Sequence, residues 1–372
     1  MIGADVETIP LARPVIGPGE ERRVLEVLRS GSLSLGRLLP EFERTFATRL
    51  GAAYASAVSS GTAGLHLALR AAGVSDGDEV VTSPFSFVAS ANAVLFERAR
   101  PVFADIDPIT LNLEPAAARA VVTERTAAIL PVHIFGYPAD LPAFETLGLP
   151  IVEDACEALG AVHRDGVAVG ARGHPAVFAF YANKQLTTGE GGMVTTANAS
   201  VKERIDSERN QGRAPDMGWL DHDRLGFNYR LSEIACALGL EQLGHLDQML
   251  ADRARVAGSY GEALATIEGL DPPCPDSGGD RRGWFVFVVQ LPRGVDRDET
   301  VRALGQRGIQ SKPYLPAIHL MSFYRERFGH RPGEFPVCED VAERSIALPF
   351  FPAMTDGQVE RVVAELRSVL GR

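Results

Sequence analysis

The stretch from Val177 to Val194 reads Val-Phe-Ala-Phe-Tyr-Ala-Asn-Lys-Gln-Leu-Thr-Thr-Gly-Glu-Gly-Gly-Met-Val. An apolar and aromatic run of strand length stops at Lys184, and a glycine-rich turn then leads into a second β-prone run, Met193 to Thr196. The pattern places the lysine at a strand end that faces a tight turn. Partial burial there disfavours the ammonium form and favours the amine, which is the nucleophile of Schiff-base chemistry. The alternative is a solvated turn lysine.

Length, composition and charge exclude several classes of protein. A chain of 372 residues predicts one large and one smaller domain, which we place at residues 1–250 and 251–372. No apolar run is long enough to span a bilayer and the N-terminal stretch carries acidic residues, so we expect a cytoplasmic protein. A net charge of -11 argues against binding to nucleic acid or to an anionic membrane. Four cysteines without a C-x-x-C pair argue against a disulfide framework and a structural zinc site.

Residues 54–153 alternate between strand and helix patterns. Strands are expected at 54–58, 79–82, 101–105, 127–132 and 150–153, with helices at 65–70, 88–96, 115–122 and 141–147 between them. This alternation predicts an α/β fold with a three-layer α/β/α large domain and a mostly parallel sheet, followed by a smaller C-terminal α+β domain. Ligands of such sheets bind beyond the carboxyl ends of the strands, where Pro84–Phe87, His133, Asp154 and Lys184 lie. A long helix is expected from Glu233 to about Tyr260, capped by Ser232.

Small residues separate the first strand from the helix that follows it. The segment Ser59–Gly64 lies between the apolar strand Tyr54–Val58 and the helical run Leu65–Arg70. A helix that begins in this way presents free backbone N–H groups and its positive end to a phosphate. The segment is not a Walker motif, because no Gly-Lys-Ser/Thr follows. A plain strand-to-helix turn is the alternative.

Three side chains near the strand ends have both a functional and an ordinary interpretation. Asp154 follows the apolar strand 150–153, so its carboxylate needs a cationic partner, such as a protonated pyridine nitrogen, unless it is simply a helix N-cap. Phe87 can stack on a planar cofactor or pack in the core. Arg230 is suited to bidentate phosphate contact or to a surface ion pair.

Taken together, these segments resemble the DegT/DnrJ/EryC1/StrS family of pyridoxal-phosphate sugar aminotransferases of fold type I. The resemblance runs from Ile9 to Pro349. Four segments in the family's order and spacing carry it: Ser60–Ala63 with Leu65–Leu69, Glu153–Ala155, Asn183–Gly192 and Gly226–Glu233. It implies an aspartate aminotransferase-like fold and a homodimer with shared active sites.

The resemblance also implies roles for the residues of the cofactor site. Lys184 would form the internal aldimine with pyridoxal 5'-phosphate and shuttle the proton, Asp154 would pair with the pyridine nitrogen, and Phe87 would lie against the ring.

Further residues would bind the phosphate and the substrate. Gly61, Thr62 and Ala63 would hold the phosphate, and Asn228 would reach the phosphate of the neighbouring subunit. The segments that border the nucleotide-sugar pocket in relatives contain Arg230, Tyr314 and His319.

Two positions depart from the family pattern. Many members have Phe-Ser-Phe before the lysine, with the serine bonded to the phosphate, whereas this chain has Phe178-Ala179-Phe180. Glu157 stands where a Gln commonly contacts the phenolic oxygen of the cofactor. A carboxylate facing a phenolate is repulsive, so either its pKa is raised or Glu157 turns away.

The implied reaction is a two-half transamination. An amino group would pass from glutamate through pyridoxal phosphate to a nucleotide-linked keto-sugar, with a 4-keto-6-deoxyhexose chosen on family frequency alone, to give an amino sugar for glycan or natural-product biosynthesis. The alternatives are a 3-keto sugar or a cyclitol ketone as substrate, or a non-catalytic regulatory protein of the same fold. A related dehydratase is disfavoured, because relatives of that kind replace the lysine with histidine.

Overall fold

The computed structural model describes residues 7–214 and 221–371. Residues 1–6, which form part of the N-terminal stretch considered above, lie outside this range. Within the described residues, no helix is both long enough and apolar enough to cross a membrane.

A central, mostly parallel sheet organises the N-terminal part of the chain. The strands β3-β2-β4 pair in parallel, and β5-β6-β7-β1 form a second ladder in which β5 and β6 are parallel while β7 and β1 run antiparallel to their neighbours. Bridges from Ile129 to Ile151 and from Val132 to Asp154 join the two ladders. The expected α/β fold is confirmed. The strands are β1 (Tyr54–Val58), β2 (Glu79–Thr82), β3 (Arg100–Phe103), β4 (Thr126–Leu130), β5 (Glu153–Asp154), β6 (Ala176–Ala179) and β7 (Gly192–Thr196).

Helices cover both faces of this sheet, as the apolar character of its strands requires. Along β6, Val177 packs in the cluster that contains α3, whereas its neighbour Phe178 packs in the cluster of α2 and α8. Successive strand residues point to opposite faces, so these two clusters are the two sides of one three-layer structure. The helices that precede Lys184 in the chain are α1 (Pro18–Ser30), α2 (Leu38–Leu50), α3 (Gly61–Ala71), α4 (Ala89–Phe96), α5 (Pro115–Ala120) and α6 (Leu141–Glu145).

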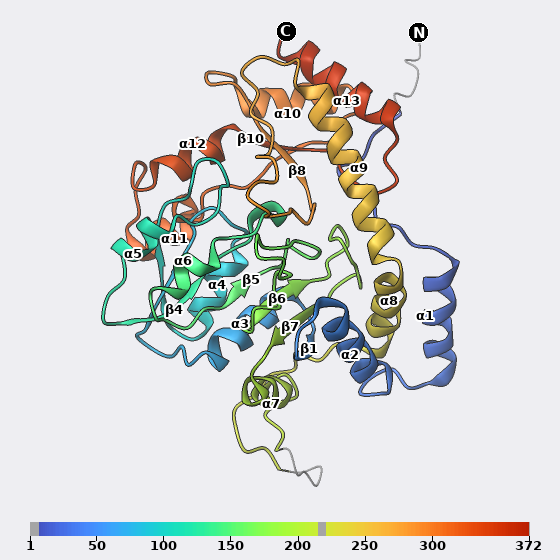
Figure 1. Ribbon diagram of the computed structural model, residues 1–372, viewed down its shortest axis with the longest axis vertical. Helices are drawn as coiled ribbons and strands as arrows, with labels where there is room; N and C mark the ends of the chain where they lie inside the picture. The colour runs from blue at the N-terminus through green and yellow to red at the C-terminus, as the bar shows by residue number, and fades with distance from the viewer. Residues whose placement is uncertain (1–6, 215–220, 372) are drawn as a thin grey trace.

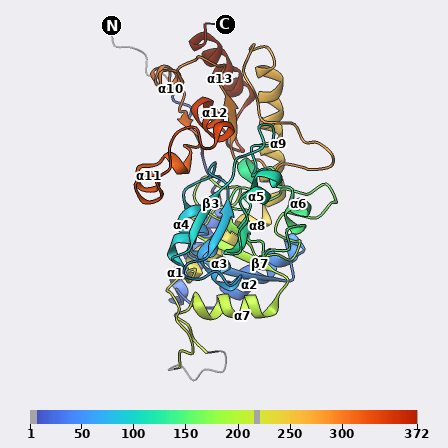
Figure 2. The ribbon, with the colours of Figure 1, turned by 90° about the vertical axis from the view of Figure 1, so that its left-hand side faces the viewer.

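The C-terminal part forms a separate antiparallel sheet with its own apolar cluster. The strand order is β8-β10-β9, and Ile9 from the N-terminal segment bridges to Ile309 beside it. Figures 1 and 2 both show α10 and α13 at one end of the molecule and α7 at the opposite end. The elements of this part are β8 (Phe287–Gln290), β9 (Lys312–Pro313), β10 (Ser345–Leu348), α10 (Arg297–Gln306), α11 (Ser322–Phe328), α12 (Pro336–Arg344), α13 (Asp356–Val369) and the 3-10 helix Ile318–Leu320. A second 3-10 helix, Ile134–Gly136, lies between β4 and α6 in the N-terminal part.

The long helix expected after Ser232 is two helices. Ser232 Oγ caps the first by accepting a bond from Ala235 N–H, as expected. That helix, α8 (Glu233–Gly244), ends before His245, whose φ of -104° and ψ of 2° are not helical, and α9 (Leu246–Leu264) begins beyond it. Gly244 is a weak helix former at this break. Because α9 runs across residue 250, the domain boundary near that residue stays a prediction.

The segment between the two sheets contains α7 (Ala199–Glu208), a helix with several charged residues. It is exposed only in part, since Ile205, Ser207 and Glu208 are buried. Glu208 accepts a hydrogen bond from Arg70 Nε at 2.8 Å, so a charged residue faces inward here with its partner.

Candidate active site

Lys184 lies in a turn rather than at the strand end. Strand β6 stops at Ala179, and the chain then turns so that Lys184 N–H donates to Tyr181 O at 3.0 Å. The Lys184 side chain is only 12% exposed, so the interpretation as a solvated turn lysine is wrong. Its Nζ lies 3.7 Å from the centroid of the Phe285 ring and 3.7 Å from Glu157 Oε1. The amine is therefore held between an aromatic face and a carboxylate.

Glu157 is buried and turned toward the lysine. Its Oε2 accepts a hydrogen bond from Phe135 N–H at 2.9 Å. Burial raises the pKa of Glu157, and Asp154 adds to the effect, while Lys184 and the Phe135 N–H oppose it. The raised pKa is one of the two outcomes expected for this departure from the family pattern. Phe135 has a φ of 51°, unusual for a residue other than glycine, so the donor to Glu157 comes from a strained backbone.

Asp154 is the last residue of β5 and is 5% exposed. Ser90 Oγ donates to its Oδ2 at 2.6 Å, and Cys156 N–H donates to its Oδ1 at 3.2 Å. None of residues 155–160 is helical, so the interpretation of Asp154 as a helix N-cap is wrong. Asp154 and Lys184 both act on the pKa of Glu157, which brings these three groups into one electrostatic cluster.

The N-terminus of α3 meets the end of β6. The helix begins at Gly61, four residues earlier than the sequence pattern predicted, because Ser60 Oγ accepts from Ala63 N–H at 3.1 Å and caps it. A Cβ on Gly61 would lie 2.7 Å from the Ala179 Cβ and 2.9 Å from the Cys156 Sγ, so only glycine fits. The first turn of the helix, with its unpaired N–H groups, is thereby drawn against the segment that follows Asp154.

Two predicted aromatic residues have different surroundings. Phe87, in the loop between β2 and α4, is 63% exposed, which excludes the interpretation as core packing. Tyr314 lies with its ring centroid 5.7 Å from Phe135 and 6.4 Å from Phe285, the residue beneath the lysine amine. Burial raises the pKa of Tyr314 well above its usual value.

The remaining predicted residues do not all lie beside the cluster of Lys184, Glu157 and Asp154. Asn228 is exposed and pairs through its backbone with Asn210. Arg230 Nη1 donates to Asn210 Oδ1 at 3.0 Å, a bond to an amide rather than a surface ion pair. His319 is fully buried, with Nε2 3.1 Å from Glu339 Oε1, and burial lowers its pKa. Its contacts within the described residues are with Glu339 and nearby aromatic rings, so the structure does not bring its side chain to Lys184.

Sequence reasoning missed several residues that support the cluster. Gln185 Nε2 donates to Glu157 O at 2.6 Å and to Gly283 O at 3.0 Å, and its place next to Lys184 was a signal that could have been used. Ser90 and Phe285 come from segments remote in the chain, so no local pattern pointed to them. Arg253 on α9 donates to Lys184 O at 3.3 Å and was likewise unmarked.

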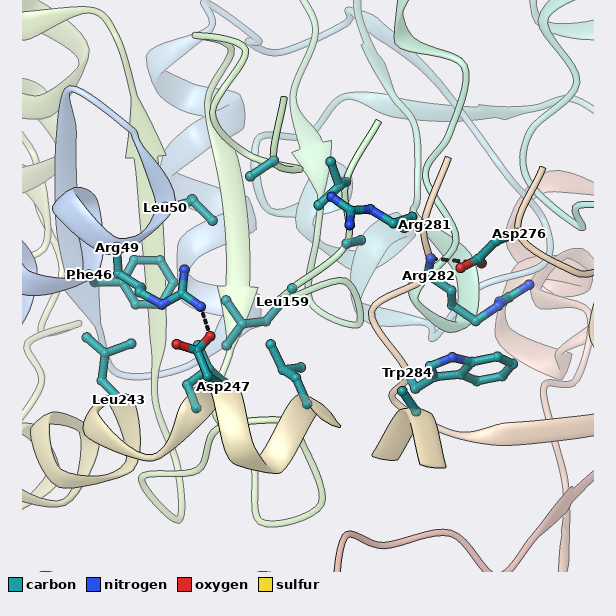
Figure 3. Close-up of a pocket in the computed structure, with 17 residues that line it drawn as sticks. Phe46, Arg49, Leu50, Leu159, Leu243, Asp247, Asp276, Arg281, Arg282 and Trp284 are labelled. Carbon is teal, nitrogen blue, oxygen red and sulfur yellow. Dashed lines mark hydrogen bonds and ion pairs between the residues drawn. The ribbon is translucent and has the colours of Figure 1, made fainter. Parts of the chain in front are cut away.

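A separate cavity of about 410 Å³ lies between α2, α8, α9 and two loops (Figure 3). Apolar side chains such as Leu159 and Leu243 line it, and the ion pair of Arg49 and Asp247 lies at one side. None of the predicted site residues lines this cavity. It borders the lysine cluster only through chain neighbours, such as Trp284 beside Phe285, and is not the site itself.

The described residues thus combine a buried amine, two buried carboxylates and a helix N-terminus, the set of groups that suits a phosphorylated, electron-withdrawing aldehyde. Comparison with known proteins agrees. The family model of the DegT/DnrJ/EryC1/StrS aminotransferase family matches residues 14–367. The chain is 36% identical to the spore coat polysaccharide biosynthesis protein SpsC of Bacillus subtilis, covering 97% of each.

Two further relatives cover almost the full chain. GDP-perosamine synthase of Caulobacter vibrioides is 36% identical over 99% of this chain and 100% of its own. The crystal structure of S. venezuelae DesV in complex with a ketimine intermediate superposes with a TM-score of 0.89 at 34% identity, covering 95% of this chain and 94% of that one. This chain therefore belongs to the DegT/DnrJ/EryC1/StrS aminotransferase family and is a sugar aminotransferase.

Proposed function

We propose that this chain uses pyridoxal 5'-phosphate to transfer an amino group from glutamate to a nucleotide-linked keto-sugar. The observation that carries the proposal is the position of Lys184, whose Nζ lies 3.7 Å from the buried carboxylate of Glu157, in a cluster that also includes Asp154. A relative named as a synthase of GDP-perosamine supports a nucleotide-linked substrate.

The residues of the cluster fit this cofactor. The first turn of α3 would hold the phosphate through the N–H groups of Gly61, Thr62 and Ala63 and the Thr62 hydroxyl. Ala179 lies against Gly61 and offers no hydroxyl, so the phosphate depends on the helix more than in relatives with serine there. Asp154, fixed by Ser90, would face the pyridine nitrogen, and the exposed ring of Phe87 would lie against the cofactor ring.

Bound pyridoxal phosphate supplies an electron sink for the carbon that loses its proton and carries the amino group between the two half-reactions. Lys184 Nζ takes that proton and returns it. Burial raises the pKa of Glu157, and this would limit the repulsion between its side chain and the cofactor oxygen. Asp154 would support a positive charge on its ring partner.

The substrate side is built from the surrounding segments. We propose that Arg230 and Tyr314 border the sugar nucleotide, with Arg230 free to exchange its amide contact for a phosphate. His319 would act indirectly, by supporting its segment, because its side chain has no exposed surface. On family frequency, the amine is placed at C4 of a 6-deoxyhexose.

We propose a homodimer in which Asn228 reaches the phosphate site of the neighbouring subunit. Its exposure in the single chain supports this. Chains with Lys184→Ala and Asn228→Ala, each impaired alone, should regain activity when mixed, because a mixed dimer contains one complete site. Failure of the mixture to regain activity, with dimers shown by sedimentation, would place Asn228 outside the shared site.

The lysine is tested first. Lys184→Ala should abolish transamination and remove the visible absorbance band of the lysine-bound cofactor, while wild-type protein should lose that band on addition of glutamate. A Lys184→Ala variant that turned over normally would remove Lys184 from its role.

The substrate is tested with a panel of nucleotide keto-sugars and glutamate as donor. We expect the highest kcat/KM with a 4-keto-6-deoxy sugar. Preference for a 3-keto sugar would show that the amine is added at C3. Activity on a cyclitol ketone, without binding of any nucleotide diphosphate, would show that the substrate is a cyclitol ketone and not a nucleotide sugar.

A further inference from the structure

Arg253 is a buried cation without a carboxylate partner. It lies on α9 and is 4% exposed. Its Nη1 donates to Phe285 O at 3.0 Å, and its Nη2 donates to Lys184 O at 3.3 Å and Asn183 O at 3.4 Å. Within residues 7–214 and 221–371, it forms no ion pair with an acidic side chain. Every hydrogen bond of this guanidinium therefore goes to a backbone carbonyl.

Such an arrangement is costly for stability. Besides the carbonyl dipoles, the Arg253 guanidinium has the ring of Phe350 beside it, with the ring centroid 5.6 Å from Cζ. A buried charge balanced in this way loses its hydration without the Coulomb energy of an ion pair. The Nε of Arg253 has no partner among the described residues, and burial lowers the pKa of the guanidinium to about 10. A methionine would fill the same space without this cost, so packing alone does not account for an arginine here.

The carbonyls that Arg253 binds belong to the residues that meet at the amine. The Lys184 Nζ rests 3.7 Å from the centroid of the Phe285 ring, and Arg253 binds the backbone of both residues. These residues come from different parts of the fold. The lysine turn follows β6 of the large sheet, whereas Phe285 leads into β8 of the C-terminal sheet.

Helix α9 spans the distance between these parts. Figure 1 shows it running along one side of the molecule from α8 toward α13. The planar fork of arginine can bind two carbonyls at fixed spacing, whereas the ammonium of lysine is a point donor on a flexible stem. Arg253 thus fixes the two backbones relative to each other.

We infer that Arg253 is a positioning residue that holds the Lys184 amine over the Phe285 ring by binding the backbone carbonyls of both residues. It does not touch the substrate. The inference rests on the proposed role of Lys184, since a positioned amine matters only if that amine reacts.

The test compares Arg253→Met with wild type, using full-length protein freed of cofactor. Pyridoxal phosphate is added, and the growth of the visible band is followed by stopped flow. We expect Arg253→Met to form the band at least about tenfold more slowly and to lose about 10- to 100-fold in kcat, because a small displacement of a reacting group slows the reaction strongly. The melting temperature should be equal to or above that of wild type, and KM for the keto-sugar should change less than twofold.

Arg255→Met is the matched control on the same helix. Arg255 Nη2 also binds a backbone carbonyl, Met354 O at 2.8 Å, but this lies in the C-terminal loop. Its loss should lower the melting temperature and leave the rate of band formation unchanged. Arg253→Lys, which keeps the charge without the fork, should fall between wild type and Arg253→Met, and it serves as the test if the methionine variant does not fold.

The inference is overturned if the soluble Arg253 variants melt at lower temperature but form the band at the wild-type rate, because Arg253 is then a structural residue. Failure of the proposed function looks different: wild-type protein itself would form no band with pyridoxal phosphate. A rise in KM for the keto-sugar without a change in kcat would also overturn the inference, since it would assign Arg253 to substrate binding.

Discussion

Two buried arginines differ in the groups that balance their positive charge. Arg209 follows α7 and is 8% exposed, and Arg253 on α9 is 4% exposed. Arg209 forms ion pairs with Glu43 and with Asp206, the latter at 2.7 Å. Burial alone would lower its pKa, but these two carboxylates outweigh burial and raise it. Among the described residues, Arg253 has backbone carbonyls as hydrogen-bond partners and the ring of Phe350 with its centroid 5.6 Å from Cζ, but no carboxylate, and burial lowers its pKa to about 10.

The difference separates a structural charge from a functional one. Arg209 also donates to Ala57 O at 2.5 Å, so it joins α7, α2 and β1 in a network in which charges are balanced. Around Lys184 the balance is incomplete, because Glu157 has a raised pKa and Arg253 has no carboxylate partner within residues 7–214 and 221–371. Perturbed groups of this kind gather where chemistry is performed. The comparison predicts that substitutions in the first network affect stability and those in the second affect rate.

The largest effect is expected from Arg209→Met. It leaves Glu43 buried without its main partner, which should reduce the free energy of unfolding by about 3–5 kcal/mol in denaturant titrations. Turnover per folded molecule should stay within about threefold of wild type.

Replacement of both partners is the control for this prediction. Arg209→Met combined with Glu43→Met removes both charges and should recover most of the lost stability. If Arg209→Met instead left stability unchanged and reduced turnover, the division between the two networks would be wrong.

Asp154→Asn should act on rate. The amide oxygen can accept from the Cys156 N–H and the amide nitrogen can donate to Ser90 Oγ, but the negative charge is lost. We therefore expect kcat to fall about 100- to 1000-fold with little change in melting temperature. The matched control is Asp105→Asn, because Asp105 accepts bonds from Val337 N–H and Cys338 N–H and should affect stability alone. Equal turnover in Asp154→Asn and wild type would contradict a role for the charge.

The smallest effect is expected from Glu157→Gln, and it depends on pH. The folded-state pKa of Glu157 is raised by burial, so the folded protein binds this proton more tightly than the unfolded chain does. The stability that the proton provides is fully present below the unfolded pKa and is lost as pH rises through the folded pKa.

Glu157→Gln should therefore have the same stability as wild type at acidic pH. It should become more stable than wild type as pH rises above about 4.5, the pKa of the unfolded chain. The gain should be about 1 kcal/mol, typical of a single substitution. Melting curves from pH 4 to pH 8 measure it. If the stability difference between Glu157→Gln and wild type instead grew as pH fell, the pKa of Glu157 would be lowered in the folded protein, not raised.

The sequence predicted most strands of the large sheet to within two residues, because these strands are largely apolar runs between turn residues, but the strand expected at 150–153 is observed at Glu153–Asp154. It placed β1 and β2 at their observed bounds. It misplaced Lys184 relative to β6, because Phe180 and Tyr181 continue the apolar pattern while their backbone already pairs with Gly189 and Gly191 across the turn. It also missed the break at His245, since the apolar periodicity continues on both sides of it.

What the sequence determined by itself was local: the cap at Ser232, the small residues between β1 and α3, and the lysine before a glycine-rich turn. These depend on neighbours along the chain and on the residue types that a tight backbone demands. The tertiary structure alone decided which groups surround the amine, namely Phe285 beneath it, Glu157 beside it and Arg253 behind it. Those distances follow from how α9 and the two sheets pack, and no local pattern encodes them.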